Sequence, residues 1–233
     1  MIDTAPLHFT SEISAAHIAT AVRFESRLRP RYFSLAHSGE PWFRLLRGSV
    51  PVLLTAPHAT AAMRHGHWHG PDDGTGWLAY MLHRLAGASV LHTTRGSPSD
   101  PNYYDDNAFK AAVKHELAVR APKIVLDVHG CHWSHPFDID LGTMHGRSLL
   151  GQSEMLHRLR SALRAEGLSR LSDNRFPAAR NATVTKWVAD HGTPCVQLEV
   201  QSTWLHPQRD RNRAHRSARL LQGLSRYIKS FEP

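Results

Sequence analysis

Hydrophobic residues along the chain form short runs that alternate with stretches of helical spacing. The runs are rich in β-branched residues and bounded by Gly, Pro or His, and they predict strands at residues 50–55, 87–94, 123–128 and 194–200. Between the first two runs, apolar residues at i, i+3, i+4 and i+7 predict a helix, at Leu78, Met81, Leu82 and Leu85. Strands that alternate with helices favour an α/β fold, with a mixed, mainly parallel sheet flanked by helices on both faces.

Further helices are expected near both ends of the chain and beside the later strands, at residues 11–24, around Phe109, after Ser148, and at 184–191 and 211–231. A loop is expected at residues 168–182. No internal repeat, low-complexity tract or linker divides the sequence. We therefore expect a single domain over residues 1–233.

The composition is that of a globular protein. Of its 233 residues, 41% are hydrophobic, which is enough for a core, and no apolar run approaches the roughly 20 residues of a membrane span. With no basic-plus-apolar leader at the amino terminus, we expect a cytoplasmic protein without a membrane partner. The two cysteines, Cys131 and Cys195, form no CxxC pair and are expected to be free thiols.

The net charge of +8 favours anionic partners. Much of it lies at helical spacing in residues 158–170 and 209–219, as in a solvated helix face. No P-loop, zinc-finger spacing or aromatic RNA-binding signature accompanies the charge, so nucleic acid is not the expected partner. A basic nucleic-acid-binding protein is the alternative from a different functional class.

Polar side chains stand at three predicted strand ends. His58 follows Pro57, which ends its strand because proline has no backbone N–H to donate. His129 follows the run 123–128, and Glu199 lies near the end of the run 194–200. Open α/β sheets bind ligands at the carboxyl ends of strands, so we expect these side chains to meet in one crevice. A buried carboxylate is costly without a partner, which favours a functional role for Glu199.

These residue types suit a catalytic zinc site, which uses three His or Asp/Glu ligands and leaves one position for water. The pair Asp72-Asp73 supplies a carboxylate ligand or, alternatively, caps the following helix. Asp127, two residues before His129, is a candidate to orient that imidazole. The alternating histidines at 65, 67 and 69 are more typical of an exposed loop than of a metal site.

Other mechanisms have less support in the sequence. A serine hydrolase is disfavoured because no GxSxG elbow is present. A thiol mechanism that uses Cys131 beside His129 is an alternative, as is a metal-binding protein without catalysis.

Five motifs in order resemble the N-formylglutamate amidohydrolase family of zinc-carboxypeptidase-like hydrolases: APH at 56–58, DDGTGWLA at 72–79, DPN at 100–102, LDVHG at 126–130 and QLEV at 197–200. The resemblance covers about residues 43–205, with 1–42 and the helix 207–233 as additions. It implies a zinc-carboxypeptidase/phosphorylase-hydrolase-like sheet and one zinc ion per chain. The implied ligands are His58, Asp72 (rather than Asp73) and His129, and Glu199 is the implied general base.

The resemblance also implies that Asn102 contacts substrate, with Arg95 upstream as a candidate for binding a carboxylate. Members that act on formylglutamate have an arginine after this asparagine, whereas this chain has Tyr103. An arginine fork suits a carboxylate better than a tyrosine does, so the substrate stays open. Arg175, Arg180 or Lys186 are candidate replacements.

We expect a zinc-dependent amidohydrolase acting on an N-acyl amino acid or similar carboxylate-bearing small molecule. A zinc peptidase for short or γ-glutamyl peptides is the alternative.

Overall fold

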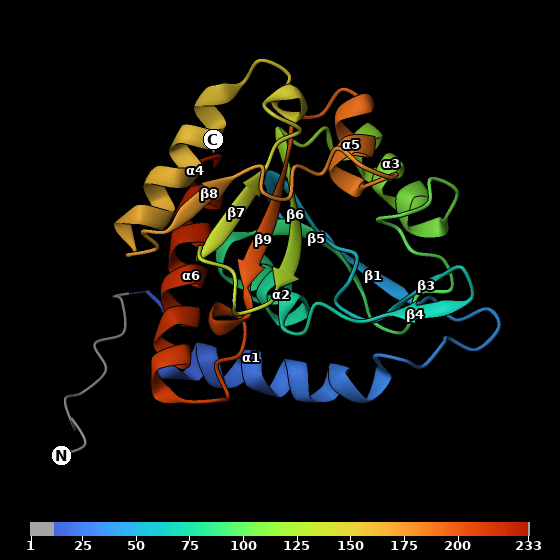
Figure 1. The fold of residues 1–233 in the computed structure, drawn as a ribbon, viewed down its shortest axis with the longest axis horizontal. Coiled ribbons are helices and arrows are strands. Elements are labelled where there is room, and N and C mark those ends of the chain that lie inside the picture. The colour runs from blue at the N-terminus through green and yellow to red at the C-terminus, as the bar shows by residue number, and fades with distance from the viewer. Residues whose placement is uncertain (1–11, 233) are drawn as a thin grey trace.

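The computed structural model describes residues 12–232, which form one large sheet, a small hairpin and helices on both sheet faces (Figure 1). The strands of the large sheet are β1 (Phe43–Leu46), β2 (Val50–Ala56), β5 (Ala88–Thr93), β6 (Ile124–Cys131), β7 (Ile139–Gly142), β8 (Leu171–Asp173) and β9 (Cys195–Gln201). The hairpin consists of β3 (Ala62–Arg64) and β4 (His67–His69). The α-helices are α1 (Ala15–Leu28), α2 (Thr75–Ala86), α3 (Ala108–Arg120), α4 (Ser153–Ala165), α5 (Val184–Asp190) and α6 (Arg211–Lys229).

The large sheet has seven strands in the order β1-β5-β2-β6-β9-β7-β8. Its four central strands, β5, β2, β6 and β9, are parallel, whereas β1 and β7 run antiparallel to their inner neighbours. The predicted fold class, a mixed and mainly parallel sheet with flanking helices, is confirmed.

Each face of the sheet has its own hydrophobic cluster. The larger cluster joins the sheet to α1, α2, α4 and α6, and the smaller one joins it to α3 and α5, which lie side by side at the upper right of Figure 1. Ile18 of α1 and Leu220 of α6 belong to the larger cluster. The two terminal helices, outside the segment that carries the family resemblance, therefore complete the core on one face.

Three local predictions need correction. The strand expected to stop at Val128 continues to Cys131, because residues 129–131 stay paired with residues 199–201 of β9. The expected loop at 168–182 contains the short edge strand β8, which pairs with β7. Ser148 lies in a 3-10 turn, and α4 begins later, at Ser153. In each case long-range pairing or packing outweighs the local pattern.

The turn before α2 depends on a glycine. Gly74, the residue preceding α2, has φ +101, a conformation that glycine adopts without steric cost. A Cβ at this position would lie 2.5 Å from the carbonyl oxygen of Leu205. This close packing fixes the loop that carries Asp72 and Asp73.

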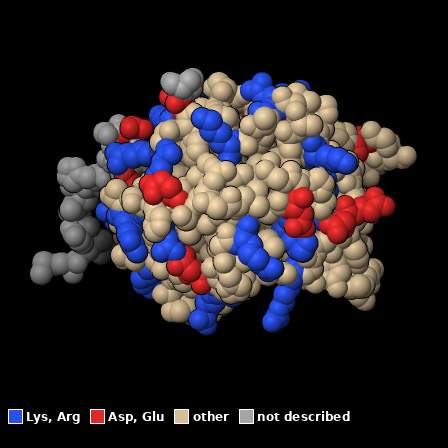
Figure 2. Space-filling model, turned by 90° about the horizontal axis from the view of Figure 1, so that it is seen from above, with Lys and Arg blue, Asp and Glu red and all other residues tan. Residues whose placement is uncertain are grey.

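Basic side chains are spread over the face shown in Figure 2, where acidic and uncharged residues separate them. Several arginines of the later helices and loops make ion pairs, such as Arg170 with Asp138 at 2.8 Å and Arg226 with Glu166. Within residues 12–232, no helix combines the length and the apolar character that crossing a membrane requires.

Candidate metal centre

The strand β2 ends at Ala56, Pro57 prevents it from continuing, and His58 is the next residue. Its side chain is buried, with 3% exposed. Its carbonyl oxygen accepts a hydrogen bond of 2.8 Å from the backbone N–H of Asp72, which ties the loop before α2 to this strand end. The Asp72 carboxylate then lies 3.5 Å from Nδ1 of His58, measured to Oδ2.

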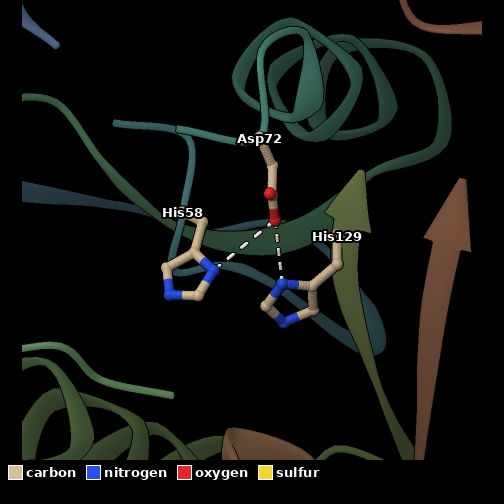
Figure 3. A group of neighbouring side chains, drawn as sticks. All are labelled: His58, Asp72 and His129. Carbon is tan, nitrogen blue, oxygen red and sulfur yellow. Dashed lines mark hydrogen bonds and ion pairs between the residues drawn. The ribbon is translucent and has the colours of Figure 1, made fainter. Parts of the chain in front are cut away.

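His129 approaches the same carboxylate oxygen from β6. Its Nδ1 lies 3.0 Å from Oδ2 of Asp72, and the centroids of the two imidazole rings are 5.1 Å apart. Figure 3 shows the carboxylate between the two rings, with both Nδ1 atoms turned toward it. The ligand atoms of His58, Asp72 and His129 all lie within 4.8 Å of one another. The structure thus brings together the three residues proposed as ligands.

A second carboxylate stands behind each imidazole. Nε2 of His58 lies 2.9 Å from Oδ1 of Asp100, and Nε2 of His129 lies 3.3 Å from Oδ2 of Asp127. The second contact is too poorly aligned for a hydrogen bond, and Nε2 of His129 is buried without one. A carboxylate beside Nε2 favours the tautomer that carries its proton on Nε2. In this tautomer Nδ1, which faces Asp72, keeps its lone pair for a metal ion.

Both outer carboxylates are held in place. Asp127 accepts hydrogen bonds from the hydroxyls of Thr55, at 2.7 Å, and Thr185, at 3.1 Å. Asp100 accepts from the backbone N–H of Asn102, at 2.7 Å, and from the guanidinium of Arg64. Sequence reasoning identified Asp127 but missed Asp100 as a partner, although it begins the DPN motif.

The charges of this cluster fit a divalent cation. Burial opposes the protonation of His58, but Asp100 and Asp72 outweigh it and raise its pKa to about 9. Burial likewise opposes protonation of His129, yet Asp127 and Asp72 raise its pKa well above the ordinary value. Without a cation, two imidazolium protons therefore balance the carboxylates. A divalent ion bound to neutral imidazoles would replace those two protons and leave the local charge unchanged.

The donor set also fits. Two imidazole nitrogens and one carboxylate oxygen are typical ligands of a catalytic zinc site, which keeps a further position open. His58, Asp72 and His129 are therefore the residues that could hold a metal ion, and the fit rests on their mutual distances and on the carboxylate behind each ring.

Glu199 lies beside this cluster on β9. The strands β6 and β9 pair Glu199 directly with His129, so both side chains leave the same face of the sheet. Gln197 donates a hydrogen bond of 2.9 Å to Oε1 of Glu199. Burial raises the pKa of Glu199 to about 8, against the opposing influence of the His129 imidazolium. The side chain is nevertheless partly exposed, which allows it to meet a ligand.

Asp73 faces away from the imidazoles. Its carboxylate makes an ion pair of 2.8 Å with Arg29 and accepts a hydrogen bond of 2.7 Å from the hydroxyl of Tyr32. Neither aspartate side chain caps α2, because the residue before the helix is Gly74 and the side chain that accepts a bond from its first turn is Glu25, from the N–H of Trp77 at 3.2 Å. The helix-cap interpretation of the aspartate pair is therefore wrong.

The alternating histidines lie on the β3–β4 hairpin. The ring of His69 packs edge-on to His58 with 5.0 Å between centroids, and Nε2 of His65 lies 3.1 Å from the hydroxyl of Tyr103. His67 is exposed. The group of mutually close ligand atoms found in residues 12–232 does not include them.

The residues predicted to bind substrate have different environments. Oδ1 of Asn102 accepts a hydrogen bond of 2.8 Å from the backbone N–H of Val184. Its side-chain NH₂ group is therefore the part that can donate a hydrogen bond to a substrate. Arg95 forms an ion pair with Glu40 at 3.5 Å. Arg180 is exposed and makes no ion pair or hydrogen bond with another described residue. No direct contact joins Arg95 or Arg180 to the histidines and aspartate above.

A cleft of about 570 Å³ is lined in part by Asp72 and Asp73. Its walls include Cys131, the last residue of β6, and Trp133. They also include Arg209, just before α6, and Arg213 in the first turn of that helix. Sequence reasoning assigned these arginines to a solvated helix face. Their spacing of four residues was the available signal, but it does not distinguish a cleft wall from an open surface.

Comparisons with known proteins place the fold in a class. No protein-family model and no curated protein sequence matches this chain. Solved structures do match, and they include hydrolases of the formylglutamate amidohydrolase and carboxypeptidase type, in agreement with the fold that the motif resemblance implied.

Three of these structures illustrate the likeness. The N-formylglutamate amidohydrolase of Ralstonia eutropha is 15% identical with a TM-score of 0.54, and the match covers 81% of this chain and 98% of that one. A bacteriophage poly-γ-glutamate hydrolase is 16% identical with a TM-score of 0.50, covering 83% and 89%. A gene product of Agrobacterium tumefaciens is 14% identical with a TM-score of 0.52, covering 87% and 100%. At these identities the likeness establishes the fold.

Proposed function

We propose that this protein is a zinc-dependent hydrolase that cleaves an amide bond. The observation that carries the proposal is the convergence of His58, Asp72 and His129 on one point, with a buried carboxylate behind each imidazole. A carboxylate behind a ligating histidine is the usual outer partner in metal sites. The similarity in fold to amide hydrolases supports the same reaction class.

The residues of the chain have distinct roles in this proposal. His58, Asp72 and His129 hold the ion, and Asp100 and Asp127 orient the two imidazoles. A bound zinc ion supplies Lewis-acid chemistry, since it polarises a carbonyl group and lowers the pKa of water to about 7. A cation bound beside Glu199 would lower the pKa of its carboxyl group, which burial raises to about 8, and so favour the carboxylate form. This carboxylate accepts a proton from the attacking water as the new C–O bond forms. It then delivers that proton to the leaving amine as the C–N bond breaks.

The substrate proposed here carries a carboxylate. Two of the hydrolases similar in fold act, by their names, on formylglutamate and on poly-γ-glutamate. In this chain the cleft beside Asp72 offers Arg209 and Arg213, whose guanidinium groups suit a carboxylate. Asn102 contributes its amide N–H, while Arg95 and Arg180 stay proposals with less support because neither contacts the cluster.

The size of the cleft favours a second candidate within the same reaction class. A volume of about 570 Å³ is in the range that accommodates a drug-sized ligand, which is much larger than a formyl group. A short or γ-glutamyl peptide is therefore the alternative substrate to a simple N-acyl amino acid.

The thiol mechanism is disfavoured. Burial, together with the nearby acids Glu199 and Asp72, raises the pKa of the Cys131 thiol to about 12. The thiolate is the nucleophilic form, so very little of it exists at neutral pH.

Metal analysis followed by a hydrolysis screen tests the proposal. We expect about one zinc ion per chain, and turnover of N-acyl amino acids or short acidic peptides that a chelator abolishes and zinc restores. His58→Ala should lose both metal and turnover. His67→Ala, which removes an exposed histidine of the neighbouring hairpin, should lose neither. A protein that hydrolyses these substrates equally well after chelation would contradict the proposal.

A further inference from the structure

A second cavity lies on the side of the sheet covered by α1. It has a volume of about 500 Å³ and is formed by α1, the 3-10 turn Arg29–Arg31, β1, β5 and α2. Four arginines line it: Arg23, Arg27, Arg31 and Arg44. None of its lining residues belongs to the candidate metal centre or to the cleft beside Asp72.

The arrangement of these arginines has an energetic cost without a ligand. Arg23, Arg27 and Arg31 follow one another at intervals of four residues, so they share one side of α1 and its terminal turn. Like charges at this spacing repel one another and destabilise a helix. Arg44 then adds a fourth positive charge from the edge strand β1.

No acidic side chain compensates this charge. The cavity has no Asp or Glu in its lining, and within residues 12–232 none of the four arginines forms an ion pair. Their neighbours in the sequence behave differently: Arg29 pairs with Asp73, and Arg47 pairs with Glu116. Arg23 donates a hydrogen bond of 2.9 Å to the neutral hydroxyl of Thr20, so the four guanidinium groups at the cavity have no acidic partner among the described residues.

The floor of the cavity is aromatic and uncharged. The rings of Phe24 and Tyr80 stack with 4.5 Å between centroids, and Phe24 lies 5.7 Å from the ring of His92. His92 is 2% exposed, and its Nδ1 bonds the carbonyl oxygen of Thr93 at 3.0 Å, so Nε2 is left as an acceptor. Burial, with a smaller contribution from Arg44, lowers the pKa of His92 to about 4, which keeps the ring neutral at pH 7.

We propose that this cavity binds a small polyanion with a flat aromatic group, the chemistry of a nucleoside di- or triphosphate. Guanidinium groups bind phosphate oxygens in a fork, and four of them balance several negative charges rather than a single carboxylate. The aromatic floor offers a surface on which a planar ring can stack, and Nε2 of His92 accepts a hydrogen bond from its edge. The volume is that of an ordinary small-molecule site.

Calorimetric titration of the full chain tests this site. We expect ATP to bind one per chain at physiological salt with a dissociation constant below the millimolar range. Pyrophosphate should bind more weakly than ATP because it lacks the flat group. Arg27→Ala and Arg44→Ala, which change exposed side chains, should each weaken ATP binding at least tenfold.

Two control variants separate this site from the others. Arg29→Ala, on the same terminal turn but paired with Asp73, should bind ATP as the unmodified protein does. His58→Ala should also bind ATP normally, because the proposed metal centre contributes nothing to this cavity. Failure of the hydrolase proposal would therefore leave this inference standing.

Three results would overturn the inference: no saturable binding of ATP, binding that Arg27→Ala leaves unchanged, or tight binding of a DNA or RNA duplex with none of ATP. If pyrophosphate bound as tightly as ATP, the flat group would not contribute to binding, and the proposal of a nucleotide ligand would be wrong.

Discussion

His129 and Glu199 are direct neighbours on two parallel strands, since the register of β6 and β9 pairs their Cα atoms. The same register pairs Asp127 with Gln197, two residues earlier on each strand. A proposed ligand, its outer carboxylate and a proposed base are therefore positioned by backbone hydrogen bonds of the sheet rather than by mobile loops. Strand-borne groups of this kind are held more precisely than groups on loops, which suits catalysis.

Glu199→Gln separates metal binding from proton transfer. The amide has nearly the same shape as the carboxyl group but cannot accept the proton from water. We expect zinc content to stay unchanged and kcat to fall by about 10²–10⁴-fold, the usual contribution of general acid–base catalysis. Metal analysis and steady-state kinetics on the substrate found by screening measure the two effects. Full activity in this variant would remove Glu199 from the mechanism.

The two adjacent aspartates provide a matched pair for metal binding. Asp72→Asn should lower zinc affinity by more than 100-fold, because the loss of a direct ligand exceeds the roughly 10–100-fold effect of an outer partner. Asp73→Asn should retain the metal, since the carboxylate of Asp73 contacts Arg29 and Tyr32 and not the imidazoles. Competition with a fluorescent zinc chelator measures both affinities. The opposite ranking would assign the ligand to Asp73.

The carboxylates behind the imidazoles should act on the metal indirectly. We expect Asp100→Asn and Asp127→Asn each to lower zinc affinity by about 10–100-fold, because the neutral amide orients and polarises the imidazole less well. Asp105→Asn, an exposed acid that pairs with Lys110, is the control and should leave zinc affinity unchanged. Equal affinities in all three variants would show that the outer carboxylates do not support the site.

Glu25 should make stability depend on pH. Burial raises the pKa of its carboxyl group to about 7, which Asp73 reinforces and hydrogen bonds from Tyr32 and Trp77 oppose. Between pH 4.5 and 7 the folded state therefore binds more protons than the unfolded state. The free energy of unfolding should fall as the pH rises through this window, by up to roughly 3 kcal/mol at about 1.4 kcal/mol per pKa unit.

Glu25→Gln should remove this contribution, so that the difference in unfolding free energy between pH 5 and pH 8 is smaller in the variant than in the unmodified protein. Urea unfolding with a chelator present in both samples measures it without interference from metal binding. An identical pH dependence in the two proteins would show that Glu25 is not the responsible group.

Much of the fold and part of the site could be predicted from the residues. Pro57 ends β2 because it has no backbone N–H to donate to a neighbouring strand. The apolar runs before His129 and around Glu199 predict strands from their own residue types. Alternation of these strands with amphipathic helices then determined the α/β class, because parallel strands require crossover connections. These features depend on nearby residues and on general rules of chain topology.

Only the tertiary structure decided which polar groups face one another. The orientation of Asp72 depends on the backbone bond to His58 and on the packing of Gly74 against Leu205, far along the chain. Asp100 becomes a partner of His58 only because its loop is folded against that strand end. Arg44 of β1 likewise lines the same cavity as the arginines of α1 only in the folded chain. Such contacts join segments distant in sequence, so no local pattern of residues specifies them.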